Sequence, residues 1–285
     1  MVSNDIYTLK PIKREEHIII DSSLGNKLIN ASKGLVIYSG IIDGYIMIKR
    51  NMLEIENKIK FYEENWMREE TDFRDVNRLM INFLSTLYFF INYCERKINP
   101  VFELVKKKYY DRYFEYRLFY HLRNYATHSN YSIVSVTHIN KEEKNTFTIN
   151  IKSSDLINND VLSKKFKEEI KNLNVEDIVL NTYLKNFKRI IFDLLLEILI
   201  LSKKEITDYF SLLMTNVQNR KEDRIDTFLC LNDEIILSLL KMPNKFLNSL
   251  YVDIINKDVD QEYKLNLYNN ITTWFNSLQN IYFDE

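Results

Sequence analysis

Residues 71–91 read TDFRDVNRLMINFLSTLYFFI and carry the pattern that decides the fold class. Their apolar residues recur at intervals of three and four, the spacing that places side chains on one face of an α-helix. Thr71 or Asp72 supplies an N-cap, and Pro100 closes the segment. The pattern therefore predicts a long amphipathic helix that buries one face. That face consists of Val76, Leu79, Met80, Phe83, Leu84, Leu87, Phe90 and Ile91.

Helical periodicity extends over most of the chain on either side of this segment. Residues 1–24 lack it and are expected to form an irregular lead-in. The aromatic and basic stretch 101–128 is expected to be one helix that ends after His128. Further helices are expected at 26–64, 155–172, 175–202, 206–219 and 233–241, and over much of the chain after Pro243.

Glycine is scarce enough to exclude several folds and sites. The only glycines are Gly25, Gly34, Gly40 and Gly44, and none occurs from Tyr45 to Glu285. No segment of the chain therefore matches the glycine-rich loops that bind dinucleotides or nucleoside triphosphates. With only three prolines as well, the chain has few of the residues that a many-turned β-sandwich uses. The fold class is expected to be mainly α.

One β-hairpin is expected within the helical pattern. Residues 131–139 and 146–151 alternate between apolar and polar side chains, and the polar loop 140–145 separates them.

The domain organisation follows from these patterns. We expect a lead-in at 1–24, a helical domain at 25–202 that contains this hairpin at about 131–151, and a helical C-terminal region at 203–285.

Composition indicates an ordinary globular chain without a metal or cofactor site. The 285 residues are 46% hydrophobic and 28% charged, with a net charge of −1, so any nucleic-acid site must be local. The four histidines show no metal-ligand spacing. Cys94 and Cys230 are isolated in apolar contexts and are expected to be buried, reduced thiols. Neither a signal peptide nor a membrane span is recognisable, so a cytoplasmic protein is expected.

The stretch Val101–His128, VFELVKKKYYDRYFEYRLFYHLRNYATH, interleaves aromatic with basic residues. The segment from Glu103 to Arg123 contains six lysines or arginines and three acidic residues, a local excess of three positive charges in a nearly neutral chain. This excess predicts a local basic patch on the helix.

The last six residues of that stretch, RNYATH at 123–128, combine groups that can act on a phosphodiester. The arginine fork matches phosphate oxygens, histidine transfers protons near neutral pH, and an amide can bind either partner. On a regular helix Asn124 and His128 share a face, whereas Arg123 lies about 140° from His128. Either the helix end is distorted, or a second copy supplies the missing partner. Alternatively, Arg123 pairs with a carboxylate and His128 caps the helix end.

The segment Phe114–His128 resembles the active-site helix of the HEPN superfamily. The signature of that family is an arginine, four to six residues and then a histidine, often with a polar residue directly after the arginine. Arg123, Asn124 and His128 match its four-residue form. The resemblance implies a HEPN-like helical bundle that dimerises with two motif copies at the interface. It further implies a metal-independent endoribonuclease of toxin, abortive-infection or antiviral defence systems.

The resemblance also implies roles for individual residues. His128 would be the acid or base, Arg123 would stabilise the charged phosphorane, and Asn124 would orient His128 or the scissile phosphate. Cleavage of RNA, either tRNA or mRNA, would leave 2′,3′-cyclic phosphate and 5′-hydroxyl ends. Expected RNA contacts are Lys106, Lys107, Lys108, Arg112, Arg117, Tyr116, Tyr120 and His121.

One position departs from some relatives in that family. Certain HEPN toxins carry a tyrosine two residues after the histidine, which a partner nucleotidyltransferase modifies. Asn130 stands there in this chain, so control by such an antitoxin is not expected, although a regulatory protein partner is. The alternative function is a non-catalytic HEPN-like scaffold that binds RNA or a protein. A third reading is an unrelated helical protein in which Arg123 and His128 are structural.

Overall fold

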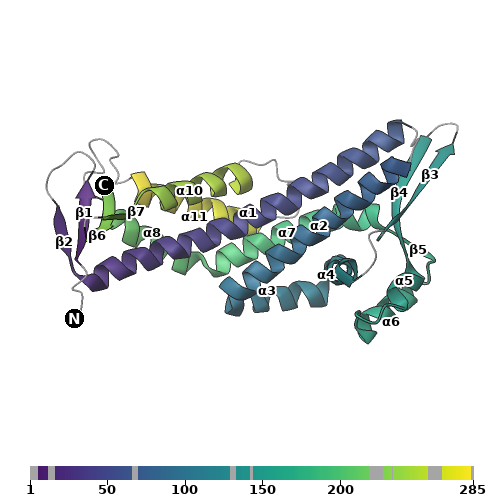
Figure 1. The fold of residues 1–285 in the computed structure, drawn as a ribbon, viewed down its shortest axis with the longest axis horizontal. Helices are drawn as coiled ribbons and strands as arrows, with labels where there is room; N and C mark the ends of the chain where they lie inside the picture. Colours follow the sequence, from purple (N-terminus) through teal and green to yellow (C-terminus); the bar gives the residue numbers. More distant parts are fainter. Residues whose placement is uncertain are drawn as a thin grey trace. The chain divides into compact units, whose positions relative to one another are not determined.

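A computed structural model describes residues 6–11, 17–65, 70–128, 133–141, 144–217, 227–232, 234–255 and 265–283. The chain is mainly helical, as the periodicity predicts (Figure 1). It divides into two compact units, which we call the motif unit, Gly44–Leu195, and the terminal unit, Met1–Asp43 with Leu196–Glu285. The boundaries fall inside helices α1 (Ser22–Glu64) and α7 (Leu180–Leu201), so the division differs from the expected one at 202/203.

The motif unit is built on aromatic packing between three helices. Rings from α2 (Glu70–Lys97), α4 (Phe114–His128) and α7 meet in its core. The centroids of Phe83 and Phe119 lie 5.4 Å apart and those of Phe119 and Phe187 lie 4.8 Å apart. All three rings are fully buried, which removes a large apolar area from water. The further helices of the unit are α3 (Asn99–Arg112), α5 (Ser153–Ile157) and α6 (Lys164–Leu173).

Polar contacts fix how α1 and α7 pack within this unit. Asn51 of α1 donates to Thr86 of α2 over 2.8 Å, and Lys58 pairs with Asp75 at 2.9 Å, so the two helices run antiparallel. Lys188 of α7 pairs with Glu56 of α1 at 2.7 Å.

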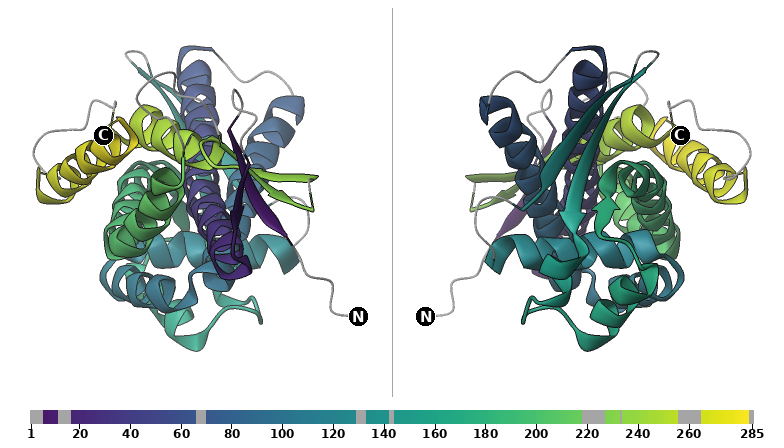
Figure 2. Two further views of the ribbon diagram at one scale, coloured as in Figure 1. Left: turned by 90° about the vertical axis from the view of Figure 1, so that its left-hand side faces the viewer. Right: turned by 90° about the vertical axis from the view of Figure 1, so that its right-hand side faces the viewer.

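The expected helix at 101–128 is two helices in the structure. Tyr113 adopts an extended conformation, with φ −116° and ψ 119°, and separates α3 from α4. Pro100 stands in the first turn of α3, where its missing N–H is not needed. The chain therefore turns at Tyr113, and α4, which is seen nearly end-on in Figure 1, runs across the views of Figure 2.

The predicted hairpin is confirmed. Strands β3 (Ser135–Lys141) and β4 (Lys144–Lys152) pair antiparallel, with Thr137 opposite Thr148. A third strand, β5 (Asp177–Val179), extends this sheet, so the helix expected at 175–202 begins only at Leu180. The helix expected at 155–172 is divided into α5 and α6, and Asn174 ends α6 in the left-handed conformation with φ 51°.

The terminal unit contains a sheet that the sequence did not predict. Four antiparallel strands lie in the order β2-β1-β6-β7. The expectation of an irregular lead-in at 1–24 is wrong, because two strands from that segment pair in this sheet. The expected helix at 233–241 is also wrong, because a strand occupies most of it and the helix starts only at Lys241. The strands are β1 (Tyr7–Pro11), β2 (Ile18–Ile20), β6 (Thr227–Leu231) and β7 (Glu234–Ser238).

Helices of the terminal unit make polar contacts with α1 and with one another. Tyr38 of α1 donates to Glu205 over 2.8 Å, and the Trp274 indole donates to Thr207 over 2.9 Å. These helices are α8 (Lys203–Thr215), α10 (Lys241–Leu250), a short π-helix η1 (Tyr251–Ile255) and α11 (Leu265–Phe283).

Candidate nucleic-acid site at Arg123

Helix α4 carries the predicted catalytic motif at its C-terminal end. Leu118, Phe119 and Leu122 are buried and fix the helix against the core of the motif unit. Because the helix is anchored by these side chains, the orientation of the neighbouring Arg123 is set by packing and not by a flexible loop.

Arg123 is almost completely buried, with an exposed fraction of 5%. Its Nε donates to the Tyr120 carbonyl over 3.3 Å, and its guanidinium carbon lies 4.2 Å from the centre of the Tyr120 ring. The ring of Tyr88, which comes from α2, lies 5.3 Å away. Tyrosine faces attract a guanidinium electrostatically, so both rings hold the cation in place. We call Tyr88, Tyr116 and Tyr120 the tyrosine cage.

Tyr116 belongs to the cage through its contact with Tyr120. Its ring stacks on that of Tyr120 with centroids 6.3 Å apart, and its hydroxyl is buried without a hydrogen-bond partner in the described chain. Burial raises the pKa of Tyr116, and the positive charge of Arg123 partly opposes that rise. The hydroxyl is therefore a neutral donor close to the arginine.

One buried nitrogen of Arg123 has unused donors. Its Nη1 is buried and has no hydrogen-bond partner, and none of the ion pairs among the described residues includes Arg123. A buried polar group without a partner costs about 1–3 kcal/mol, and more when it is charged. The cage thus holds a cation whose remaining hydrogen-bonding capacity fits an anion with several oxygen atoms.

The other two motif residues are placed differently. Asn124 is half-buried, and His128 is the last residue of α4, with a side chain outside the described part of the structure. Because α4 is α-helical through His128, the helix directs Arg123 and His128 to sides about 140° apart. The structure brings Arg123 together with Tyr88 and Tyr120.

His121 is a core residue in the structure. It is 6% exposed, its ring stacks on Phe166 with centroids 4.2 Å apart, and its Nε2 lies 2.8 Å from the Tyr110 hydroxyl. Burial, helped by the charges of Arg123 and Arg117, lowers the pKa of His121 to about 4, against the opposing effect of Glu169. The imidazole is neutral at pH 7 and does not face solvent, so this geometry offers no support for an RNA contact.

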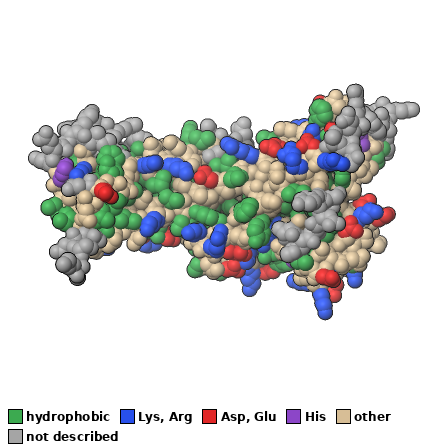
Figure 3. Space-filling view, in the orientation of Figure 1, with side chains coloured by type: hydrophobic (Ala, Val, Ile, Leu, Met, Phe, Trp, Pro, Cys, Tyr) green, Lys and Arg blue, Asp and Glu red, His purple; other side chains and the backbone are tan. Residues whose placement is uncertain are grey.

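The remaining predicted RNA contacts are ion-paired, buried or exposed. Lys106 pairs with Glu95 and Glu103, and Arg117 pairs with Glu169 at 2.8 Å, so nearby carboxylates balance both charges. The buried Tyr116 has no ring face open to solvent. Exposed basic side chains are Lys107, Lys108 and Arg112, all on α3. On the face drawn in Figure 3, basic and acidic side chains are interspersed.

Tyr88 was not anticipated from the sequence. It lies in the amphipathic segment of α2 but outside its buried stripe, and it keeps 36% of its surface exposed. Phe89 next to it is also exposed. Large aromatic residues off the buried face of an amphipathic helix were the one available signal for this contact.

Cys94 and Cys230 are buried thiols outside any disulfide, as predicted. Within the described part of the chain, no three His, Cys, Asp or Glu side chains are grouped so that they could hold a metal ion.

In the described ranges, none of the helices combines the length and apolar character needed to cross a membrane.

Comparisons with protein-family models, with curated proteins and with solved structures found no match.

Proposed function

We propose that this protein is a metal-independent, HEPN-like endoribonuclease whose scissile phosphate binds Arg123. The observation that carries the proposal is the buried guanidinium with an unpartnered Nη1 in the tyrosine cage. A phosphate at Nη1 would satisfy a donor that otherwise remains unpaired. The energy recovered there would support binding of the phosphorane more than that of the ground state, since the phosphorane carries more charge.

Access to Nη1 requires a covering side chain to move. Tyr88 is the most exposed ring of the cage and comes from a different helix, α2, so its displacement leaves α4 unchanged. An unpaired base could then stack where the Tyr88 ring lies against the guanidinium. This route favours single-stranded RNA over a duplex.

The proposed reaction uses the 2′-hydroxyl of the RNA as nucleophile. Its oxygen attacks the adjacent phosphorus and loses its proton to a base, while the bond from phosphorus to the 5′-oxygen breaks and that oxygen gains a proton from an acid. The products are a 2′,3′-cyclic phosphate and a 5′-hydroxyl. His128 supplies one proton transfer, and in a homodimer the partner subunit's His128 supplies the other. Asn124 orients His128 or the phosphate, and defence or growth arrest is the proposed context.

RNA cleavage in the presence of EDTA tests this proposal. Arg123→Lys keeps the charge but loses the planar fork, and His128→Ala removes the acid or base, so each should lower the cleavage rate at least about 100-fold. Arg96→Ala changes an exposed arginine of the same unit and serves as the matched control. The new 5′ ends should accept phosphate from a polynucleotide kinase without prior phosphatase treatment.

The same experiment separates the alternative of a non-catalytic scaffold. Full activity in both variants, or cleavage that requires added metal, would overturn the ribonuclease proposal. Binding of RNA that weakens steeply with salt, without any cleavage by the wild type, would favour the scaffold instead.

A further inference from the structure

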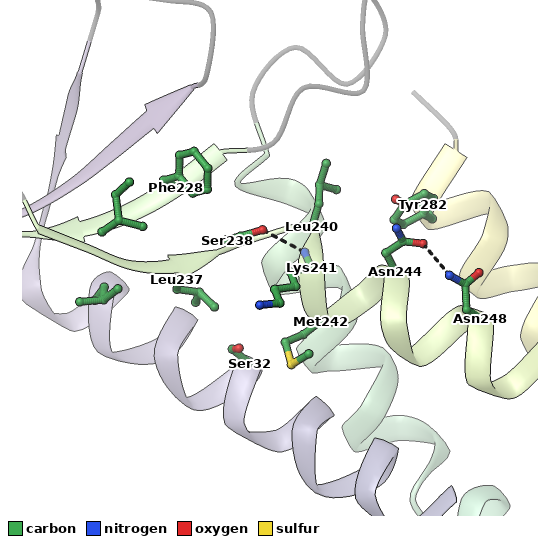
Figure 4. Close-up of a pocket in the computed structure, with 12 residues that line it drawn as sticks. Ser32, Phe228, Leu237, Ser238, Leu240, Lys241, Met242, Asn244, Asn248 and Tyr282 are labelled. Carbon is green, nitrogen blue, oxygen red and sulfur yellow. Dashed lines mark hydrogen bonds between the residues drawn. The ribbon is translucent and has the colours of Figure 1, made fainter. Parts of the chain in front are cut away.

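A groove of about 1170 Å³ in the terminal unit follows strand β7 (Figure 4). Four consecutive residues of the strand line it, at 235–238. Because successive side chains of a strand point to opposite faces, a groove that borders four in a row reaches the edge of the strand, although Phe228 of β6 and Ser32 of α1 also line it. Its volume exceeds that of most small-ligand pockets, which favours an extended chain as the occupant.

Strand β7 is the last strand of its sheet, and among the described strands it pairs only with β6. Ile235 and Ile236 leave 63% and 42% of their surface exposed. The strand contains neither lysine nor proline, the residues that commonly prevent strand addition at an edge. A bulge at Ile236 opposes the addition of another strand, because two residues of β6, Leu229 and Cys230, face three of β7. The exposed apolar side chains of β7 favour such addition.

The two ends of β7 differ in charge. Glu234 begins the strand, and at the other end the Ser238 hydroxyl accepts a hydrogen bond from the backbone N–H of Lys241 over 3.1 Å. Figure 4 shows the Lys241 ammonium directed between Leu237 and Ser32. Among the described residues no carboxylate forms an ion pair with Lys241, which is exposed, and Ser32 beside it is 7% exposed. The end near Ser238 therefore carries the positive charge of Lys241, which has no carboxylate partner among the described residues.

We propose that the occupant is strand β7 of a second copy of this chain. Antiparallel pairing about a twofold axis at Ile236 places Glu234 opposite Ser238 of the partner subunit, next to Lys241 of the partner subunit. Both ends of the interface then carry a complementary charge pair. Within one copy the same two charges cannot pair, because the strand between Glu234 and Ser238 spans about 13 Å. The occupant thus supplies, from its own sequence, the carboxylate that Lys241 lacks within one copy.

Reversal of the two charges tests the proposed pairing. Glu234→Lys places like charges at both ends of the interface, and Lys241→Glu does the same, so each variant alone should weaken self-association about tenfold. A mixture of the two variants restores both pairs and should associate as tightly as the wild type. Sedimentation equilibrium of full-length protein measures these affinities. Ile19→Lys, on the opposite edge strand β2, is the matched control and should have no effect.

A cysteine on the twofold axis gives a second readout, independent of any dimer through the motif helices. Ile236→Cys faces its own copy, at the Cα separation of about 4.5–5.5 Å that antiparallel pairing gives and a disulfide accepts. Mild oxidation should yield a covalent dimer, whereas Ile19→Cys should stay monomeric on a non-reducing gel. Absence of the Ile236→Cys crosslink, or failure of the charge-reversed mixture to restore association, would overturn the proposal. Both of these negative results are expected if the groove instead takes a strand of another protein.

Discussion

The replacement His121→Phe tests whether a buried neutral imidazole controls the acid stability of the motif unit. His121 stacks on Phe166 and lies within hydrogen-bond distance of the Tyr110 hydroxyl. Its burial is the main cause that lowers its pKa from 6.5 to about 4, and the charges of Arg123 and Arg117 add to this effect. The folded chain therefore resists protonation of this ring in a pH range where the unfolded chain accepts it.

The size and sign of the effect follow from the two pKa values. Between pH 6.5 and pH 4 the unfolded state binds more protons, so the stability associated with neutral His121 is complete above pH 6.5 and is lost as the pH falls. A separation of about 2.5 units corresponds to about 3 kcal/mol in total. From pH 7 to pH 5 the loss amounts to about 2 kcal/mol.

Equilibrium urea unfolding at pH 7, 6 and 5 measures this loss for wild type and His121→Phe. The phenylalanine keeps the stack on Phe166 but loses the hydrogen bond to Tyr110, so it should be about 1 kcal/mol less stable at pH 7. At pH 5 it should equal or exceed the wild type, because it cannot be protonated. His17→Gln, an exposed histidine, should follow the wild type at every pH. A stability difference between His121→Phe and wild type that does not change with pH would refute the reasoning.

Two further substitutions test packing and capping. Gly34→Ala should lower the free energy of unfolding by about 1–3 kcal/mol in thermal or urea unfolding, because a β-carbon there meets the ring of Tyr209, whereas Val36→Ala on the exposed side of the same helix should change it by less than about 0.5 kcal/mol. Ser163→Ala should cost about 1 kcal/mol, because the Ser163 hydroxyl accepts the Phe166 N–H and caps α6. Ser163→Asp should retain most of that stability, and equal losses in the two Ser163 variants would contradict the capping role.

The sequence predicted the helices that are amphipathic on their own. Residues 71–91 show their buried stripe at helical spacing, and the structure buries every member of it. The hairpin was also predictable, since both of its strands and its turn are contiguous. The terminal sheet was not, because Tyr7 pairs with Leu231, more than 220 residues away, and short apolar runs such as 18–20 do not identify their partners.

The candidate site was also predictable from the sequence only in part. The identity and spacing of Arg123, Asn124 and His128 are local properties of one helix and can be read from the sequence. The tyrosine cage is not local, because Tyr88 comes from α2 and its contact with Arg123 depends on how two helices cross. The break at Tyr113 was also hidden, because an aromatic residue carries no strong signal for an extended conformation.

The charges along α3 and α4 explain why we propose Arg123, and not the whole basic stretch, as the anion site. Lys106 and Arg117 each have a carboxylate partner in the described structure, which satisfies their charge. His121, between the two arginines of α4, stays neutral because both arginines and burial disfavour its protonation. Neutrality there avoids a third positive charge that the core could not stabilise. The buried positive charge left without a carboxylate among the described residues is therefore concentrated at Arg123, where an incoming phosphate would meet it.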